Sequence, residues 1–185
     1  MHRDSGTQLR AVEVRDLVAT RRWRNDPAVF VTSLGRRFPI VESGERAWFD
    51  SLGSGSFPTE IVWAVADSDD GIVGLAQLSD VHWIHRTAMF GIWLGPEHWG
   101  HGHGTRATRL VIDHGLVQLG LRQIRLHVVA EHAAARAVYE RVGFRDEALL
   151  RYAALVNGEL TDVWQMVLDA ATHDAAPPAI AVEND

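Results

Sequence analysis

Apolar and polar positions divide the chain into a helical first third and a strand-rich remainder. Residues 13–25 repeat apolar side chains at the period of a helix and end before Asp26-Pro27. Residues 42–52 show the same period, whereas residues 28–41 between them are irregular. We therefore expect a short strand at 7–12, two helices and an irregular connection between the helices.

Strand patterns dominate from residue 60 onward, and turn sequences separate them. Asp69-Asp70-Gly71 and Asn157-Gly158 are hairpin turns, because their residues tolerate the left-handed backbone that such turns require. Amphipathic helices at 106–121 and 133–142 interrupt the strands. The expected strands are 60–67, 72–81, 88–94, 123–129, 144–152 and 161–168. This order predicts an α/β or α+β fold, with a central mixed, mostly antiparallel sheet and about four flanking helices.

A glycine-rich loop joins the strand at 88–94 to the following helix. Glycines at 100, 102 and 104 let the backbone approach a ligand closely, and a helix N-terminus offers unpaired N–H groups and a partial positive charge. The loop is therefore either a diphosphate-binding device or a tight strand–helix connection. A P-loop is excluded because the chain has no lysine. A dinucleotide fingerprint is a poor match, since only Ala130-Glu131 follows the next strand.

Length and composition fit one folded domain. The 185 residues are 46% hydrophobic, and we expect a single domain at 1–170 with a disordered tail at 171–185. The net charge is −6 and no basic face stands out, which argues against nucleic acid as a partner. The chain has no cysteine, no apolar run long enough for a membrane span and no apolar N-terminal signal, so we expect a cytoplasmic protein.

The loop also carries a His-x-x-His-x-His pattern at His98, His101 and His103. This spacing is compatible with metal ligands. The glycines between the histidines are better explained by phosphate binding, so we expect no metal.

Two motifs, in this order of elements, resemble those of the GNAT family of N-acetyltransferases over residues 7–168. The family motif Gln/Arg-x-x-Gly-x-Gly/Ala lies over residues 99–104, with Trp99 in place of Gln or Arg. The motif Asn-x-x-Ala-x-x-x-Tyr-x-x-x-Gly-Phe lies over residues 132–144, with His132 in place of Asn and Tyr139 matched. The likeness is greatest to the branch of ribosomal-protein-alanine and spermidine acetyltransferases. It implies the acyl-CoA N-acyltransferase fold.

The resemblance implies acetyl-CoA as the acetyl donor. Its pyrophosphate would bind the loop amides, and its pantetheine arm would pair like an added strand with the backbone at 92–94. A bulge at Gly91 would leave a backbone N–H free to polarise the thioester carbonyl. The residues expected to bind the cofactor are Ile92, Trp93, Leu94, Trp99, Gly100, His101, Gly102, His103, Gly104, Thr105, His132, Ala135, Tyr139 and Phe144.

The resemblance assigns to Tyr139 the general acid that protonates the departing thiolate. A phenol remains protonated at neutral pH and can supply that proton, although Tyr139 also lies on the apolar stripe of its helix. The proton acceptor is open among His82, His85, Glu97 and His132, and His85 is our choice. A water chain, or reaction of the small neutral fraction of the amine, is an alternative.

The acceptor site is expected from residues 23–50, the 82–89 segment and the last hairpin. The expected substrate-binding residues are Trp23, Arg36, Arg37, Trp83, His85 and Met89. His82 to Phe90 is similar to a segment of the spermidine acetyltransferases, but Met89 and Gln77 stand where those enzymes carry acids. A polycation needs carboxylates to replace its water, so a polyamine is disfavoured.

The leading hypothesis is an acetyl-CoA-dependent N-acetyltransferase that acts on a primary amine, as a homo-oligomer that we expect to be a dimer. The acceptor would be a small molecule, such as an amino sugar, amino acid derivative or antibiotic, or a protein N-terminus. The alternatives are a non-catalytic acyl-CoA sensor and a polyamine acetyltransferase.

Overall fold

The computed structural model describes residues 6–32, 34 and 38–173, the side chains of residues 30–32 excepted. Arg36 and Arg37 therefore lie outside the described residues, as does the expected tail from residue 174. The described chain continues past the expected domain end at 170. His173 Nε2 lies 2.6 Å from Asp113 Oδ1, which holds residues 171–173 against the fold.

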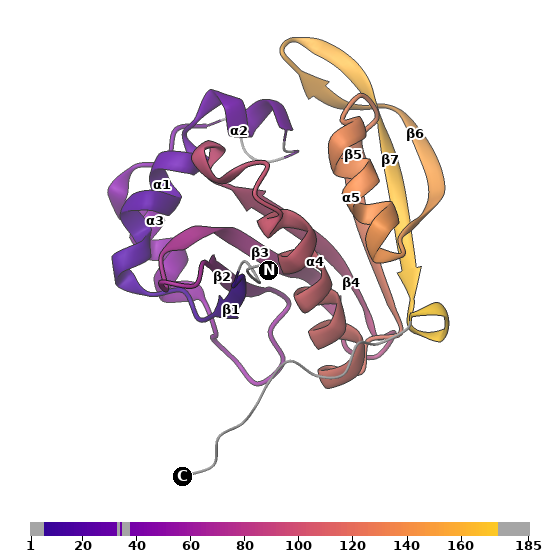
Figure 1. The fold of residues 1–185 in the computed structure, drawn as a ribbon, viewed down its shortest axis with the longest axis horizontal. Helices are drawn as coiled ribbons and strands as arrows, with labels where there is room; N and C mark the ends of the chain where they lie inside the picture. Colours follow the sequence, from indigo (N-terminus) through magenta and orange to yellow (C-terminus); the bar gives the residue numbers. More distant parts are fainter. Residues whose placement is uncertain (1–5, 33, 35–37, 174–185) are drawn as a thin grey trace, which may run out of the picture.

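Seven strands form one mixed sheet in the order β1-β2-β3-β4-β5-β7-β6 (Figure 1). Only β4 and β5 run parallel, so the prediction of a mixed, mostly antiparallel sheet is confirmed. The strands are β1 (Gln8–Arg10), β2 (Ile61–Ala66), β3 (Ile72–His82), β4 (Thr87–Leu94), β5 (Gln123–Val129), β6 (Arg145–Val156) and β7 (Glu159–Asp169).

One helix in the described chain was not expected. Asp26-Pro27 ends α1, as predicted, but it also starts α2: Asp26 Oδ1 accepts the Ala28 N–H at 2.8 Å, and Pro27 occupies the first helical position. Both residue types are favoured at helix starts. The helices are α1 (Leu17–Arg24), α2 (Pro27–Thr32), α3 (Glu42–Ser51), α4 (His103–Asp113) and α5 (Ala133–Val142). A π-helical turn, His114–Gln118, extends α4.

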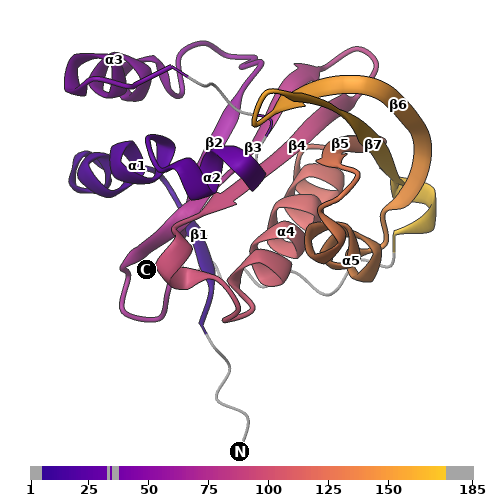
Figure 2. The same cartoon turned by 90° about the horizontal axis from the view of Figure 1, so that it is seen from above.

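The helices cover opposite faces of the sheet (Figure 2). On one face α4 and α5 pack against the even-numbered residues of β4 and β5, which belong to the main apolar core. On the other face lie α1 and α3, joined by the buried Glu45 of α3. Its carboxylate accepts from Thr20 Oγ1 at 2.6 Å and from Arg24 at 2.8 Å. Odd-numbered residues of β4 and β5 point to this second face.

The parallel pair separates along its length. β4 and β5 are paired only at Thr87–Gln123, Ala88–Ile124 and Met89–Arg125 in the described chain. The expected bulge at Gly91 is wrong, because Gly91 pairs regularly with Gln77 and the irregularity of β3–β4 lies between Ser79 and His82. The separation of β4 from β5 beyond Met89 frees the backbone edge that the bulge was expected to free.

Candidate active site

The glycine loop presents backbone amides rather than side chains. Gly100 and Gly102 have φ values of 79° and 83°, in the left-handed region that favours glycine. Gly102 is the N-cap of α4 and provides no side-chain cap, so the first-turn amides of His103, Gly104 and Thr105 are available to a ligand. A Cβ on Gly100 would meet no atom within 4 Å, so the loop faces open space there.

One cation beside the loop was missed in the sequence analysis. An ideal Cβ on Gly102 would lie 3.6 Å from Nη1 of Arg106, so this guanidinium lies next to the loop. A basic residue one turn inside a glycine-started helix was the available signal. Gly104, by contrast, is helical, and a Cβ there would make only ordinary contact with Leu94 at 3.6 Å.

Trp99 supports the loop in place of the Gln or Arg of the family motif. Its indole N–H donates to the Leu94 carbonyl at 3.0 Å, which closes the turn from β4 into the loop. Its ring is 41% exposed. The loop conformation thus depends on a hydrogen bond from this side chain, while ligand contacts are left to the amides.

The cofactor-binding residues predicted on β4 divide between the two faces. Ile92 and Leu94 pack against the core under α4. Trp93 points to the opposite face, next to Leu75 of β3, and its indole Nε1 is buried without a hydrogen-bond partner among the described residues. The backbone edge of β4 beyond Met89, not these side chains, faces the separation from β5.

Tyr139 lies beside this separation, on α5. Its ring packs edge-on against Phe90 and Phe144, at centroid distances of 6.2 and 6.0 Å. Burial raises the pKa of the Tyr139 hydroxyl to about 12. This hydroxyl makes no hydrogen bond within the described part of the chain, and it is not fully enclosed.

The remaining residues of the second motif build the start of α5. His132 is the N-cap, and its Nδ1 accepts the Ala135 N–H at 3.1 Å. An acceptor nitrogen at this place performs the capping that an Asn oxygen would provide. Phe144 is buried and packs near Phe90, with ring centroids 6.4 Å apart.

The structure does not bring His85 to Tyr139. His85 lies on the exposed β3–β4 turn, stacked on His82 with ring centroids 4.1 Å apart. That turn precedes Thr87, where β4 and β5 are paired. Gly91, where the two strands have separated, lies about 13 Å along β4 from Thr87 at ~3.3 Å per residue. His85 is therefore badly placed to act on a group held beside β4 beyond Met89.

The predicted acceptor residues also divide. Trp23 is 1% exposed, and its indole N–H donates to Glu97 at 3.1 Å, so it is a core residue and lines no open site. Trp23 leaves room only for glycine at position 95, since a Cβ there would lie 2.4 Å from the Trp23 ring. Trp83 is tied to the Pro58 carbonyl at 3.0 Å near the β3–β4 turn. Met89 remains on the open face, at the last β4–β5 pair.

A hydrogen-bonded chain on the same face as Met89 was missed entirely. Arg125 holds Glu147 with two bonds of 2.7 and 3.1 Å, and these bonds lower the pKa of that carboxyl. Gln165 donates to Glu147 at 2.8 Å, and its Oε1 lies 3.0 Å from Nε2 of His127. The Gln165 oxygen therefore accepts from His127 Nε2–H, which leaves Nδ1 unprotonated in the neutral ring. Period-two alternation along β5 was the available signal.

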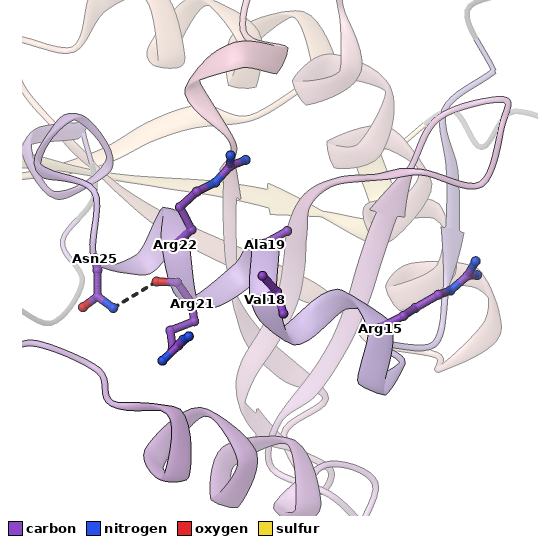
Figure 3. Close-up of a pocket in the computed structure, with 6 residues that line it drawn as sticks. All are labelled: Arg15, Val18, Ala19, Arg21, Arg22 and Asn25. Atoms are coloured by element: carbon purple, nitrogen blue, oxygen red, sulfur yellow. Dashed lines mark hydrogen bonds between the residues drawn. The ribbon is translucent and has the colours of Figure 1, made fainter.

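A shallow hollow of about 500 Å³ lies along α1 (Figure 3). Its arginines are already paired: Arg15 with Asp70, Arg21 with Glu42 and Arg22 with Glu97. Figure 3 shows Arg22 extending away from Arg21. The hollow is lined by Arg15, Val18, Ala19, Arg21, Arg22 and Asn25. None of the predicted site residues lines this hollow.

In the described part of the chain, no group of three histidine, aspartate or glutamate side chains has the arrangement of a metal site. Nor is any helix in that part long and apolar enough to cross a membrane.

A sheet that opens between its parallel strands, with a glycine loop and an uncapped helix at the opening, is the architecture of acyl-CoA N-acyltransferases. The comparison with known families agrees. The acetyltransferase (GNAT) domain matches residues 7–145, and the chain belongs to the GNAT family.

Relatives within the family include spermidine N(1)-acetyltransferases. That of Vibrio cholerae is 34% identical over 106 residues, covering 57% of this chain and 61% of the relative. That of Escherichia coli K12 is 33% identical over 104 residues, covering 56% of each. The matched region thus spans less than two thirds of these relatives. The crystal structure of the V. cholerae enzyme with CoA and spermine has a TM-score of 0.83 and 27% identity, and covers 89% of this chain and 96% of that one.

Proposed function

We propose that the protein transfers an acetyl group from acetyl-CoA to a primary amine. One observation carries the proposal: the unpaired edge of β4 beyond Met89, the uncapped start of α4 that follows this strand, and the Tyr139 ring packed on Phe90 of β4 occur together. A structural neighbour was solved with CoA, which supports this choice of donor.

The residues fit a diphosphate with an amide-bearing arm. The amides of His103, Gly104 and Thr105, the α4 dipole and the Arg106 guanidinium suit the diphosphate. The β4 edge beyond Met89 suits the amides of the arm, as in strand addition. Bound acetyl-CoA would supply the acetyl group as a thioester.

Two side chains then share the proton transfers. Burial of Tyr139 keeps its phenol protonated at neutral pH. Tyr139 would give this proton to the leaving sulfur. His127 lies on the strand across the opening, on the face open to an acceptor, with Nδ1 available as a base. It takes the proton of the attacking amine, directly or through one water.

Replacing His127 by glutamine tests this role. We expect His127→Gln to lower kcat/KM near neutral pH by about 100-fold or more, in the range of a general base. The loss should narrow at alkaline pH, where more of the amine is already neutral, and CoA affinity should not change. His85→Gln is the matched control and should retain activity. Loss of activity in His85→Gln with none in His127→Gln would reverse the assignment.

The acceptor is proposed to be a singly charged or zwitterionic amine. Five carboxylates on or near the acceptor side are already paired with an arginine. The pairs are Glu42–Arg21, Glu45–Arg24, Asp50–Arg46, Glu97–Arg22 and Glu147–Arg125. A polycation would have to compete with these guanidinium groups for the five carboxylates.

A polyamine is the second candidate, because the relatives named above act on spermidine and one neighbour holds spermine. We expect kcat/KM to be lower for spermidine and spermine than for the best amino sugar, amino acid derivative or peptide N-terminus. The measurement is acetyl-CoA consumption with mass-spectrometric detection of each product across this panel. A spermidine value above all other acceptors would establish the second candidate, and binding of CoA without transfer to any amine would favour a sensor.

We also propose a homo-oligomer located in the cytoplasm. Tyr152, Leu155 and Leu160 expose apolar surface on the β6–β7 hairpin, which supports association. A V. cholerae spermidine N-acetyltransferase with a TM-score of 0.77 was described as dodecameric. A dimer is the smallest form compatible with the proposal.

A further inference from the structure

The side chains of three histidines lie around the glycine loop, and the mechanism above gives these side chains no role. The rings of His98 and His101 lie 6.5 and 6.4 Å from the ring of His103, centroid to centroid. His103 is the first residue of α4, and His101 precedes the Gly102 N-cap. Imidazoles are thus gathered at the positive end of a helix, where a cation is unfavourable and an anion favourable.

Each ring has different surroundings. His103 Nδ1 is 2.9 Å from Oγ1 of Thr7, the residue before β1. The charges of Asp67, the residue after β2, and of Arg106 on α4 also act on the His103 ring. Burial, together with the charges of His98 and His101, lowers the pKa of His103. His98 packs edge-on against Trp23 at 5.8 Å, beside Glu97, which Arg22 pairs. His101 is exposed on the loop.

We propose that binding of a diphosphate at this loop is coupled to proton uptake by His103, so that cofactor affinity rises as the pH falls through neutrality. This inference rests on the proposed function, because it takes the loop as the site of the CoA diphosphate. It adds a regulation of that site that the GNAT motif does not contain, since the histidines occupy its variable positions.

The direction follows from the charges. Without ligand, the α4 dipole, Arg106 and the other imidazoles all oppose a charged His103, and only Asp67 favours it. A bound diphosphate adds negative charge at the start of α4, where His103 is the first residue, and favours its protonated form. The complex then holds more protons than the free protein, so affinity must increase as pH decreases, by at most about tenfold per pH unit for each proton taken up.

Titration calorimetry with dephospho-CoA tests the proposal. This ligand keeps the diphosphate but lacks the terminal phosphate monoester, which itself titrates near pH 6 and would obscure the result. We expect the affinity to rise about 5- to 20-fold from pH 8 to pH 6, the range for one proton only partly taken up. Heats measured at pH 7 in buffers of different ionisation enthalpy should show net proton uptake.

Variants locate the protons. His103→Asn should flatten the pH dependence of binding, and the introduced amide can still bond to Thr7. His82→Asn, on the distant β3–β4 turn, is the matched control and should keep the full dependence. A wild-type affinity independent of pH would overturn the coupling and leave the proposed function intact. Absence of dephospho-CoA and CoA binding at every pH would refute both.

Discussion

Gly102→Val should lower CoA affinity by about 100-fold or more without unfolding the protein. Gly102 has a φ of 83° and is the N-cap of α4, so its backbone lies where a diphosphate must approach the first-turn amides. A branched side chain there would fill that approach and press on the Arg106 guanidinium, 3.6 Å from the Cβ position. Calorimetric titration with CoA measures the loss, and circular dichroism reports the fold.

Gly120→Val separates this effect from backbone strain. Gly120 has a φ of 65°, and a Cβ there would meet no atom within 4 Å, so valine suffers a similar left-handed penalty of about 1–2 kcal/mol, away from the loop. The two variants should lose similar thermal stability, but only Gly102→Val should lose CoA affinity. If both bind CoA as the wild type does, the glycine loop is only a turn.

The elements with strong periodicity could be predicted from sequence because their burial is one-sided. The helix at 133–142 has the observed bounds, since its apolar stripe packs on the core and Gly143 ends it with a φ of 109°. The Asn157-Gly158 hairpin joins β6 and β7 as expected. α2 was missed because the residues that end one helix also start the next, and a period alone does not show this double use of Asp26 and Pro27.

The conformation of the glycine loop could be predicted because the glycines determine it. Glycines at 100 and 102 have the positive φ values that a ligand-facing loop requires, and spacing alone located them. His127 was missed because its partners, Gln165 and Glu147, come from strands that only the sheet order brings beside β5. Trp23 was misassigned because an indole on a helix face gives no sign, in sequence, of the Gly95 backbone that encloses it.

Tyr139→Phe should lower kcat by about 10- to 1000-fold and leave CoA affinity nearly unchanged, as expected for a positioned proton donor. The phenylalanine ring keeps the packing against Phe90 and Phe144, so the change removes only a hydroxyl that has no partner in the described chain. Steady-state kinetics with the best amine, and calorimetry for CoA, separate the chemical step from binding. Tyr152→Phe, at an exposed position on β6, is the matched control and should be neutral.

The pH dependence distinguishes an acid from a packing residue. Burial raises the pKa of Tyr139 to about 12, above the value near 10 of an exposed phenol, so the neutral form is favoured by folding. The corresponding stability is fully present below about pH 10 and is lost as the pH rises from about 10 to 12. Tyr139→Phe should therefore reduce the alkaline loss of thermal stability in that window, whatever the role of the hydroxyl. Loss of kcat at neutral pH is the part that packing alone does not predict. A variant that keeps the wild-type kcat while losing the alkaline effect would show that Tyr139 serves only the core.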